Sequence, residues 1–292
     1  MAYFFARELT TSALGNTPIG LIDASRGATR TESWISTPTL AANFKWSELR
    51  ESGFGATISS CYNGMIKPVM PYGIRGVLWY QGESNASRPA QFRTLTRVLI
   101  AEWRNEWNRP DLPFLFVQLP GYAQLYDDDY FMGVRESQLE IWREMPNTGM
   151  AVAIDAGMPD NVHPPVNKQD VGYRLALLAK ALVYGQDVVY SGPLYDSMKI
   201  EGDSVRLKFK YVDGGLVDRN GGSLRGFVVA GEEKVFKDAT ARIEGDTVVV
   251  RAAGVSQPRY ARYAWAPDPV ADLYNAAGLP ASPFRTDHAD SK

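Results

Sequence analysis

The chain has 292 residues, of which 45% are hydrophobic and 22% charged, the balance of an ordinary globular protein with room for a sizeable core. The formal net charge is −2 and no basic tract is present, so the charge pattern argues against a nucleic-acid partner. No run of about 18 apolar residues appears, which predicts that no segment spans a membrane.

The first predicted element is a helix over residues 2–15, where apolar side chains recur at helical spacing up to Gly15. This stretch lacks a basic n-region, a long apolar core and a cleavage site, so it is not expected to be a signal peptide, and localisation stays open. Residues 18–25, PIGLIDAS, are predicted to form a short buried strand. Helical stretches with weak boundaries follow in residues 38–66.

Strands and helices then alternate. The pattern predicts strands at the start of GVLWYQGESN, in LPFLFVQLPGY and in TGMAVAIDAG, and helices over residues 89–108, 130–146 and 167–185. Short apolar strands alternating with helices are typical of βαβ units on a parallel sheet. Functional residues of such sheets gather in the loops at the carboxyl ends of the strands. These loops are residues 23–34, 81–87, 118–130 and 155–168.

The pattern changes near residue 191. From there, short alternating strands are separated by Gly and Asp turns, which predicts an antiparallel sheet. We therefore expect an α/β domain over residues 1–190 and a β-rich subdomain with an ordered tail over residues 191–292.

The clearest candidate for a catalytic base is His163, in the loop between the last predicted parallel strand and the helix after it. Asp160 lies three residues earlier, and a carboxylate at this spacing can fix one imidazole nitrogen while the other acts as general base. The alternative is that Asp160 caps a turn and His163 is a surface residue. His288, the only other histidine, lies near the C-terminus, where a frayed tail is expected.

A catalytic base of this kind needs a nucleophile and a site for the oxyanion. Candidate nucleophiles in the same loops are Ser25, Ser33 and Ser84. Candidate oxyanion donors are the backbone N–H of Gly27 and the side-chain amides of Gln81 and Asn85.

The sequence gives little support for a metal site or for a catalytic cysteine. The single cysteine, Cys61, permits no disulfide within the chain and no cysteine metal cluster, and we expect it to be a buried structural thiol. A lone histidine with scattered carboxylates lacks the ligand spacing of zinc sites, and no glycine-rich phosphate loop is present. No metal or cofactor is therefore expected.

Several blocks, in this order, resemble the sialate O-acetylesterase family: PIGLIDASRGATRTESW, GVLWYQGESNA, DNVHPPVNKQDVGYRLA and AGLPASPFRTD. These are SGNH-type carbohydrate esterases related to acetyl xylan esterases, and their relatives are often periplasmic or secreted. The resemblance implies a flavodoxin-like, three-layer α/β/α fold with a parallel sheet, followed here by the antiparallel β subdomain. It also implies that acetylated carbohydrate is the substrate.

Position by position, Asp160 and His163 resemble the acid and base of the family's triad, and Gly27 resembles the glycine whose N–H faces the oxyanion. Gln81, with Asn85 as second choice, resembles the side-chain amide that completes the oxyanion hole. The family's nucleophile is a serine in a Gly-Gln-Ser-Asn block after the first strand, upstream of the helix that resembles AYFFAREL. This chain has no such block.

Without that strand, an internal position of the sheet is left without a neighbour, and unpaired buried backbone groups are costly. Three arrangements remain open: a missing N-terminal segment or second chain supplies the strand and the serine, another segment fills the gap, or the sheet has rearranged and Ser84 has become the nucleophile. Ser84 lies in Gly-Glu-Ser-Asn, which is similar in form to the missing block. The alternative role for Ser84 is a hydrogen bond within its own loop.

The sequence thus favours an acetylesterase of the sialate 9-O-acetylesterase type with a Ser-His-Asp mechanism. A catalytically silent carbohydrate-binding fragment is the alternative from another class. A lipase or thioesterase is a third reading, but the WYQGES and RTESW stretches show no apolar acyl groove.

Overall fold

A computed structural model describes residues 1–12, 15, 17–52, 55–122, 130–157 and 167–287 of the chain. The chain divides into two compact units. The first comprises Met1–Leu119, Leu125–Ala151 and Asn167–Val188, and the second comprises Pro120–Gln124, Val152–Val166 and Val189–Lys292. The second unit therefore groups two short segments from the middle of the chain with the C-terminal part.

The first unit is built on a parallel sheet of three strands, in the order β1 (Val77–Trp79), β2 (Phe114–Gln118) and β3 (Thr148–Val152). Strand β1 pairs with β2 in parallel, with Val77 opposite Phe114. All residues of β2 and β3 are buried, which is typical of a parallel sheet covered on both faces. The three strands confirm those predicted from the apolar runs.

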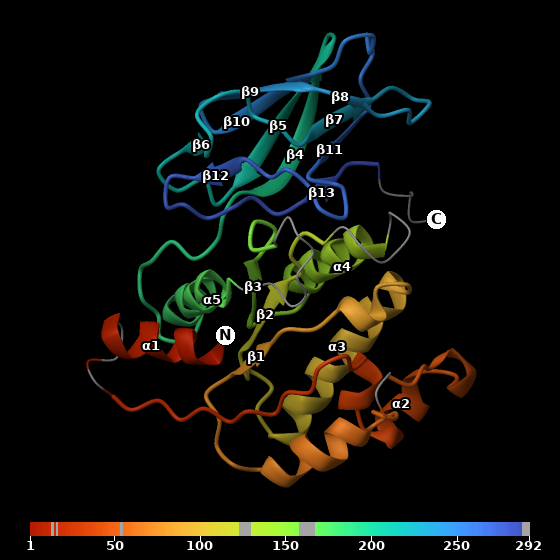
Figure 1. The fold of residues 1–292 in the computed structure, drawn as a ribbon, viewed down its shortest axis with the longest axis vertical. Helices are drawn as coiled ribbons and strands as arrows, with labels where there is room; N and C mark the ends of the chain where they lie inside the picture. The colour runs from red at the N-terminus through yellow and green to blue at the C-terminus, as the bar shows by residue number, and fades with distance from the viewer. Residues whose placement is uncertain (13–14, 16, 53–54, 123–129, 158–166, 288–292) are drawn as a thin grey trace. The chain divides into compact units, whose positions relative to one another are not determined.

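In the described ranges, the α-helices that accompany the sheet are α1 (Ala2–Ser12), α2 (Thr37–Asn43), α3 (Pro89–Glu106), α4 (Tyr130–Glu144) and α5 (Lys168–Leu182). Helix α1 packs on α5, and α3 packs on α4. Because α5 and α4 both contact β2, the sheet lies between two helical layers within this unit (Figure 1). This arrangement confirms the predicted α/β class. Helix α3 begins with Pro89 in its first turn and buries Phe92, Leu95 and Leu99 along one face, as its spacing predicts.

Short helical turns fill the connections: 3-10 turns η1 (Thr31–Trp34), η2 (Trp46–Glu48), η4 (Lys67–Val69) and η5 (Glu83–Asn85), and the π-turn η3 (Tyr62–Ile66). The weak helical stretches predicted in residues 38–66 correspond to α2, η2 and η3.

The strand predicted over residues 18–25 is wrong. The segment is neither helix nor strand, and the side chains of Leu21 and Ile22 are 47% and 50% exposed. Within the described residues, no strand pairs with it, and β1 is an end strand of the sheet. An apolar run forms a strand only where a ladder partner satisfies its backbone, so composition alone misled the prediction.

Replacing Ile22 with Thr should therefore change the free energy of unfolding by no more than about 0.5 kcal/mol, because the side chain is already half in solvent. The matched change at the fully buried Ile100 should cost about 2 kcal/mol or more. Urea unfolding of both variants checks this. Equal losses would mean that residues 18–25 are buried in solution.

The second unit is β-rich. One sheet has the order β4 (Leu194–Glu201), β5 (Ser204–Lys210), β10 (Thr247–Arg251) and β9 (Thr240–Glu244). Another has the order β13 (Phe284–Arg285), β11 (Tyr260–Tyr263), β7 (Phe227–Ala230) and β8 (Lys237–Asp238), and a two-stranded ladder joins β12 (Leu273–Asn275) to β6 (Leu216–Asp218). The described strands of this unit pair antiparallel, which confirms the predicted β-rich region. The domain boundary after residue 190 stays a prediction.

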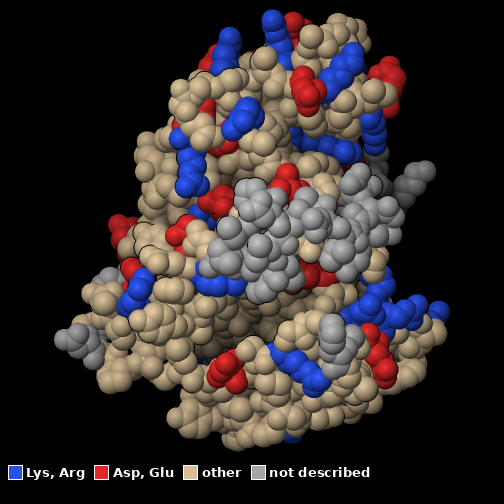
Figure 2. Space-filling view, in the orientation of Figure 1, with Lys and Arg blue, Asp and Glu red and all other residues tan. Residues whose placement is uncertain are grey.

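In the part of the chain that the structure describes, no helix combines the length and the apolar character needed to cross a membrane. Basic and acidic side chains are interspersed over the face drawn in Figure 2, in keeping with the small net charge.

Candidate active site

Two of the predicted loops meet through the side-chain amides of Gln81 and Asn85, which follow β1. The amide nitrogen of Gln81 donates to the carbonyl of Thr29 at 3.2 Å and to Oδ1 of Asn85 at 2.8 Å. Its Oε1 accepts from the hydroxyl of Thr31 at 2.8 Å, and Oδ1 of Asn85 accepts from the backbone N–H of Thr31 at 3.0 Å. Both N–H groups of the Gln81 amide are thus engaged, so its predicted oxyanion role requires one of these bonds to be exchanged.

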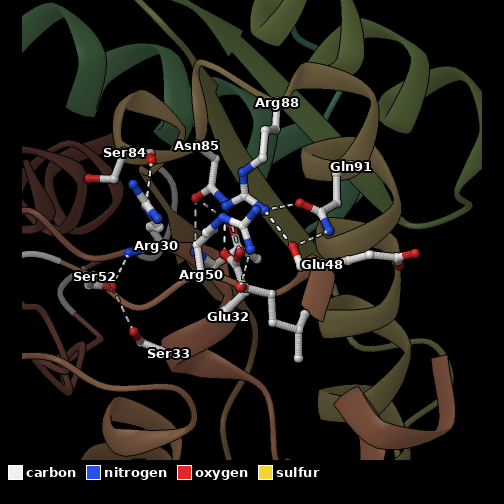
Figure 3. Close-up of polar contacts among 12 residues, drawn as sticks. Arg30, Glu32, Ser33, Glu48, Arg50, Ser52, Ser84, Asn85, Arg88 and Gln91 are labelled. Atoms are coloured by element: carbon white, nitrogen blue, oxygen red, sulfur yellow. Dashed lines mark hydrogen bonds and ion pairs between the residues drawn. The ribbon is translucent and has the colours of Figure 1, made fainter. Parts of the chain in front are cut away.

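A fully buried carboxylate, that of Glu32, contacts Asn85. The sequence analysis did not identify it as a site residue. Glu32 is 0% exposed, its Oε1 is 2.8 Å from Nη2 of Arg88, and its Oε2 accepts from Nδ2 of Asn85 at 2.8 Å (Figure 3). Nη1 of Arg88 also donates to the carbonyl of Glu48 at 3.1 Å. A buried carboxylate with two charged or polar donors fixes its neighbours firmly, and here it orients the side chain of Asn85.

Ser84 lies in a different environment from Gln81 and Asn85. Its backbone carbonyl accepts from Nε of Arg30 at 3.0 Å, which ties the loop after β1 to the segment before η1. Figure 3 shows the Ser84 side chain pointing away from Asn85 and Glu32. Among the described residues, the Ser84 hydroxyl has no hydrogen-bond partner, so the structure does not provide the hydrogen bond within its own loop that was the alternative to a nucleophile.

The other two candidate serines are already engaged. Ser33 is buried, and its hydroxyl lies 2.8 Å from the hydroxyl of Ser52. Ser25 is exposed, and its hydroxyl donates to the carboxylate of Asp23.

Gly27 lies two residues before the Thr29 carbonyl that Gln81 contacts, in an exposed segment outside any helix or strand. A Cβ built on Gly27 would meet no atom within 4 Å, so the backbone here faces open space. The hydrogen bond from Gln81 to Thr29 joins the loop after β1 to the segment after Gly27, and the oxyanion roles of Gly27 and Gln81 stay predictions.

The predicted catalytic pair, Asp160 and His163, lies outside the described residues, as does His288. The helix that follows is well defined. Asn167 caps α5 by accepting from the N–H of Asp170 at 3.2 Å.

Lys168, at the start of α5, places its ammonium group next to Tyr80, the residue before Gln81. Its Nζ lies 3.4 Å from the hydroxyl of Tyr80 and 4.5 Å from the centre of the Tyr80 ring. Burial lowers the pKa of Lys168, and the charge of Glu83 opposes this shift. Burial also raises the pKa of Tyr80, so its hydroxyl keeps its proton at neutral pH.

Cys61 is buried, as expected, and burial raises the pKa of its thiol, which disfavours the nucleophilic thiolate. In the described ranges, no group of three or more histidine, cysteine, aspartate or glutamate side chains is placed to hold a metal.

Comparison with known proteins gives three findings. The sequence profile of a family described as carbohydrate esterase, sialic acid-specific acetylesterase, matches residues 1–180. The sialate O-acetylesterases of Pongo abelii and Homo sapiens are each 35% identical to the chain over 217 residues, and the match covers 66% of this chain and 41% of each relative. The solved structure of a carbohydrate acetylesterase from Xanthomonas citri has a TM-score of 0.88 and 38% identity, and the match covers 98% of this chain and 65% of that one. The chain therefore spans about two fifths of the length of the curated relatives that it matches.

Proposed function

Because the chain belongs to the sialic acid-specific acetylesterase family of carbohydrate esterases, we propose that it takes part in removing acetyl groups from acetylated sugars. The observation that carries this proposal is the TM-score of 0.88 to a carbohydrate acetylesterase over 98% of the chain, at 38% identity. The polar loop after β1, with the amides of Gln81 and Asn85 joined to the segment after Gly27, supports it.

The reaction we propose is acyl transfer through a serine. The serine oxygen attacks the acetyl carbonyl while His163 removes the hydroxyl proton, and His163 then gives that proton to the departing sugar oxygen. Water attacks the acetyl-enzyme with His163 again as base, which releases acetate and restores the serine. Asp160 holds the imidazole and stabilises its charged form, and the N–H of Gly27 and the amide of Gln81 hold the oxyanion.

We propose that the serine is supplied by a segment outside this chain, with Ser84 as the local alternative. The first arrangement is supported by the missing Gly-Gln-Ser-Asn block, by the exposed Leu21 and Ile22, and by the position of β1 at the end of the sheet. Among the described strands β1 pairs on one side alone, and a further parallel strand would cover its other backbone edge. Ser84 remains a candidate because its hydroxyl has no hydrogen-bond partner among the described residues.

Reaction of the purified chain with a fluorophosphonate, followed by intact mass and peptide mapping, tests both arrangements, because this probe labels a serine that a base has activated. A label on Ser84 that disappears in Ser84→Ala would mean that the chain holds its own relocated nucleophile. A folded chain without label would place the working serine elsewhere. Activity should then appear when a segment bearing the Gly-Gln-Ser-Asn block is added.

If the added segment restores no acetate release but acetylated sugars still bind, the chain is instead a carbohydrate-binding fragment. Isothermal titration with an O-acetylated sialic acid and with its deacetylated form measures that binding. Preferential release of longer acyl chains would favour the lipase or thioesterase reading.

A further inference from the structure

We propose that Asn85 is a positioning residue that aims the side-chain amide of Gln81, and that Gln81 is the one of the two that donates to the oxyanion. The inference rests on the proposed function, because it assigns tasks within the predicted oxyanion site. Four residues of the first unit carry it: Thr31 and Glu32 in η1, Gln81 two residues after β1, and Asn85 in η5.

The amide of Asn85 has a single allowed orientation, because each of its ends faces a group that cannot change role. Its Nδ2 donates to Oε2 of Glu32 at 2.8 Å, and a carboxylate that is paired with an arginine only accepts (Figure 3). Its Oδ1 accepts from the backbone N–H of Thr31 at 3.0 Å, and a backbone N–H only donates. Turning the amide end for end would set donor against donor at Thr31 and oxygen against oxygen at Glu32. The oxygen of Asn85 therefore stays on the Thr31 side.

The fixed oxygen of Asn85 in turn decides how the Gln81 amide lies. Nε2 of Gln81 donates to that oxygen at 2.8 Å, and Oε1 of Gln81 accepts from the hydroxyl of Thr31 at 2.8 Å. A hydroxyl can donate or accept, so Thr31 does not choose the direction of these bonds through its side chain. The direction is set at the buried carboxylate of Glu32 and passes through Asn85 to Gln81. As a result, Gln81 presents its NH2 group, and not its oxygen, to Asn85 and to the carbonyl of Thr29.

Exposure and bond length separate the roles of the two amides. Asn85 is 0% exposed, whereas Gln81 is 8% exposed, so Gln81 alone of the pair reaches the surface of the described chain. The bond from Nε2 of Gln81 to the carbonyl of Thr29, at 3.2 Å, is longer than the 2.8 Å bond to Asn85. An oxyanion would therefore take the place of the Thr29 carbonyl, while Asn85 keeps holding the other N–H. A donor that is already aimed when the charge develops stabilises an oxyanion without reorganisation.

The same bonds join two segments of the first unit, so a loss of stability on its own does not reveal positioning. An exchange of the two side chains does. Glu32→Gln leaves one oxygen where the carboxylate had two, so Arg88 and Asn85 compete for it. Asn85→Asp sets a second buried carboxylate against Glu32. Each single variant should therefore disturb the Gln81 amide.

The double variant, Glu32→Gln with Asn85→Asp, should restore the surroundings of that amide. The new amide at position 32 gives its NH2 group to the new carboxylate at position 85 and its oxygen to Arg88. The new carboxylate still accepts from the N–H of Thr31 and from Nε2 of Gln81. The acceptor that aims Gln81 is thus rebuilt, and only the N–H groups of residue 85 are lost.

Proton–nitrogen NMR measures the effect, because the side-chain NH2 protons of Gln81 exchange with water faster when the amide loses its acceptor. Gln81→Met identifies these signals by their absence. The exchange rate should rise by up to roughly tenfold in each single variant, the equivalent of one hydrogen bond, and should fall back in the double variant. Glu102→Gln is the matched control and should leave the rate unchanged. Glu102 is 8% exposed, and its two carboxylate oxygens accept from the N–H of Ser36 at 3.2 and 3.1 Å rather than from Asn85.

An unchanged exchange rate in Glu32→Gln, or no recovery in the double variant, would overturn the positioning role. Acetate release in the presence of the segment that bears the Gly-Gln-Ser-Asn block then tells the two amides apart. Release that recovers in the double variant together with the Gln81 signal supports Gln81 as the donor. Release that stays low after the Gln81 signal has recovered would identify an N–H of Asn85 as the donor and overturn the assignment. If the wild-type chain releases no acetate with that segment, the proposed function fails, while the exchange rates still decide how the Gln81 amide is held.

Discussion

Replacing Glu32 with Ala is expected to lower the free energy of unfolding by about 3 kcal/mol, since removal of one partner from a buried ion pair leaves the other uncompensated. Glu32 is 0% exposed, and its two oxygens hold Arg88 and Asn85 at 2.8 Å each. The side chain of Arg88 is 21% exposed and can still reach water, which keeps the expected loss at the lower end of the range for such pairs.

Urea unfolding followed by tryptophan fluorescence measures this loss, with Glu106→Ala as the matched control. Glu106 pairs with Lys67 at 2.7 Å, but both side chains are partly exposed, so its removal should cost less than about 1 kcal/mol. Equal losses for the two variants would show that the Glu32 carboxylate does not support the loop. Glu32→Gln should fall between them, because it keeps one acceptor for Asn85 but loses the charge that faces Arg88.

The periodic elements could be predicted because their signals are local. The apolar spacing of α3 and the continuous apolar run of β2 depend on residues close in sequence, and both match the structure. Residues 18–25 carry a similar apolar run, yet they form no strand. The difference lies in the neighbours: β2 has a strand on each side, whereas residues 18–25 have no described strand to pair with. Pairing over long sequence distance is invisible to a local pattern.

The residues of the candidate site differ in the same way: those marked by a local pattern were predicted, and the one that depends on distant partners was not. Gln81 and Asn85 stood out because they follow a strand, and the structure places them together. Glu32 was missed because its partners, Asn85 and Arg88, lie 53 and 56 residues away. One local sign was available: Glu32 precedes Ser33, Trp34 and Ile35, all of them buried, and a carboxylate beside such residues needs a buried partner.

Gly157 offers a second prediction of large effect, because its space is limited by backbone rather than by a side chain that could turn away. A Cβ at this position would lie 2.5 Å from the carbonyl oxygen of Gly121 and 3.2 Å from its Cα. Gly157→Ala should therefore force the segments after β3 and β2 apart and cost about 3 kcal/mol, the upper end for overpacking. The midpoint of urea unfolding measures the loss.

Gly222→Ala in the same unit is the control, since a Cβ there would meet nothing within 4 Å and should change stability by no more than about 0.5 kcal/mol. If Gly157→Ala is as stable as Gly222→Ala, the two segments do not touch in solution. A loss of about 3 kcal/mol in Gly157→Ala alone would show that the segments after β3 and β2 are packed backbone to backbone.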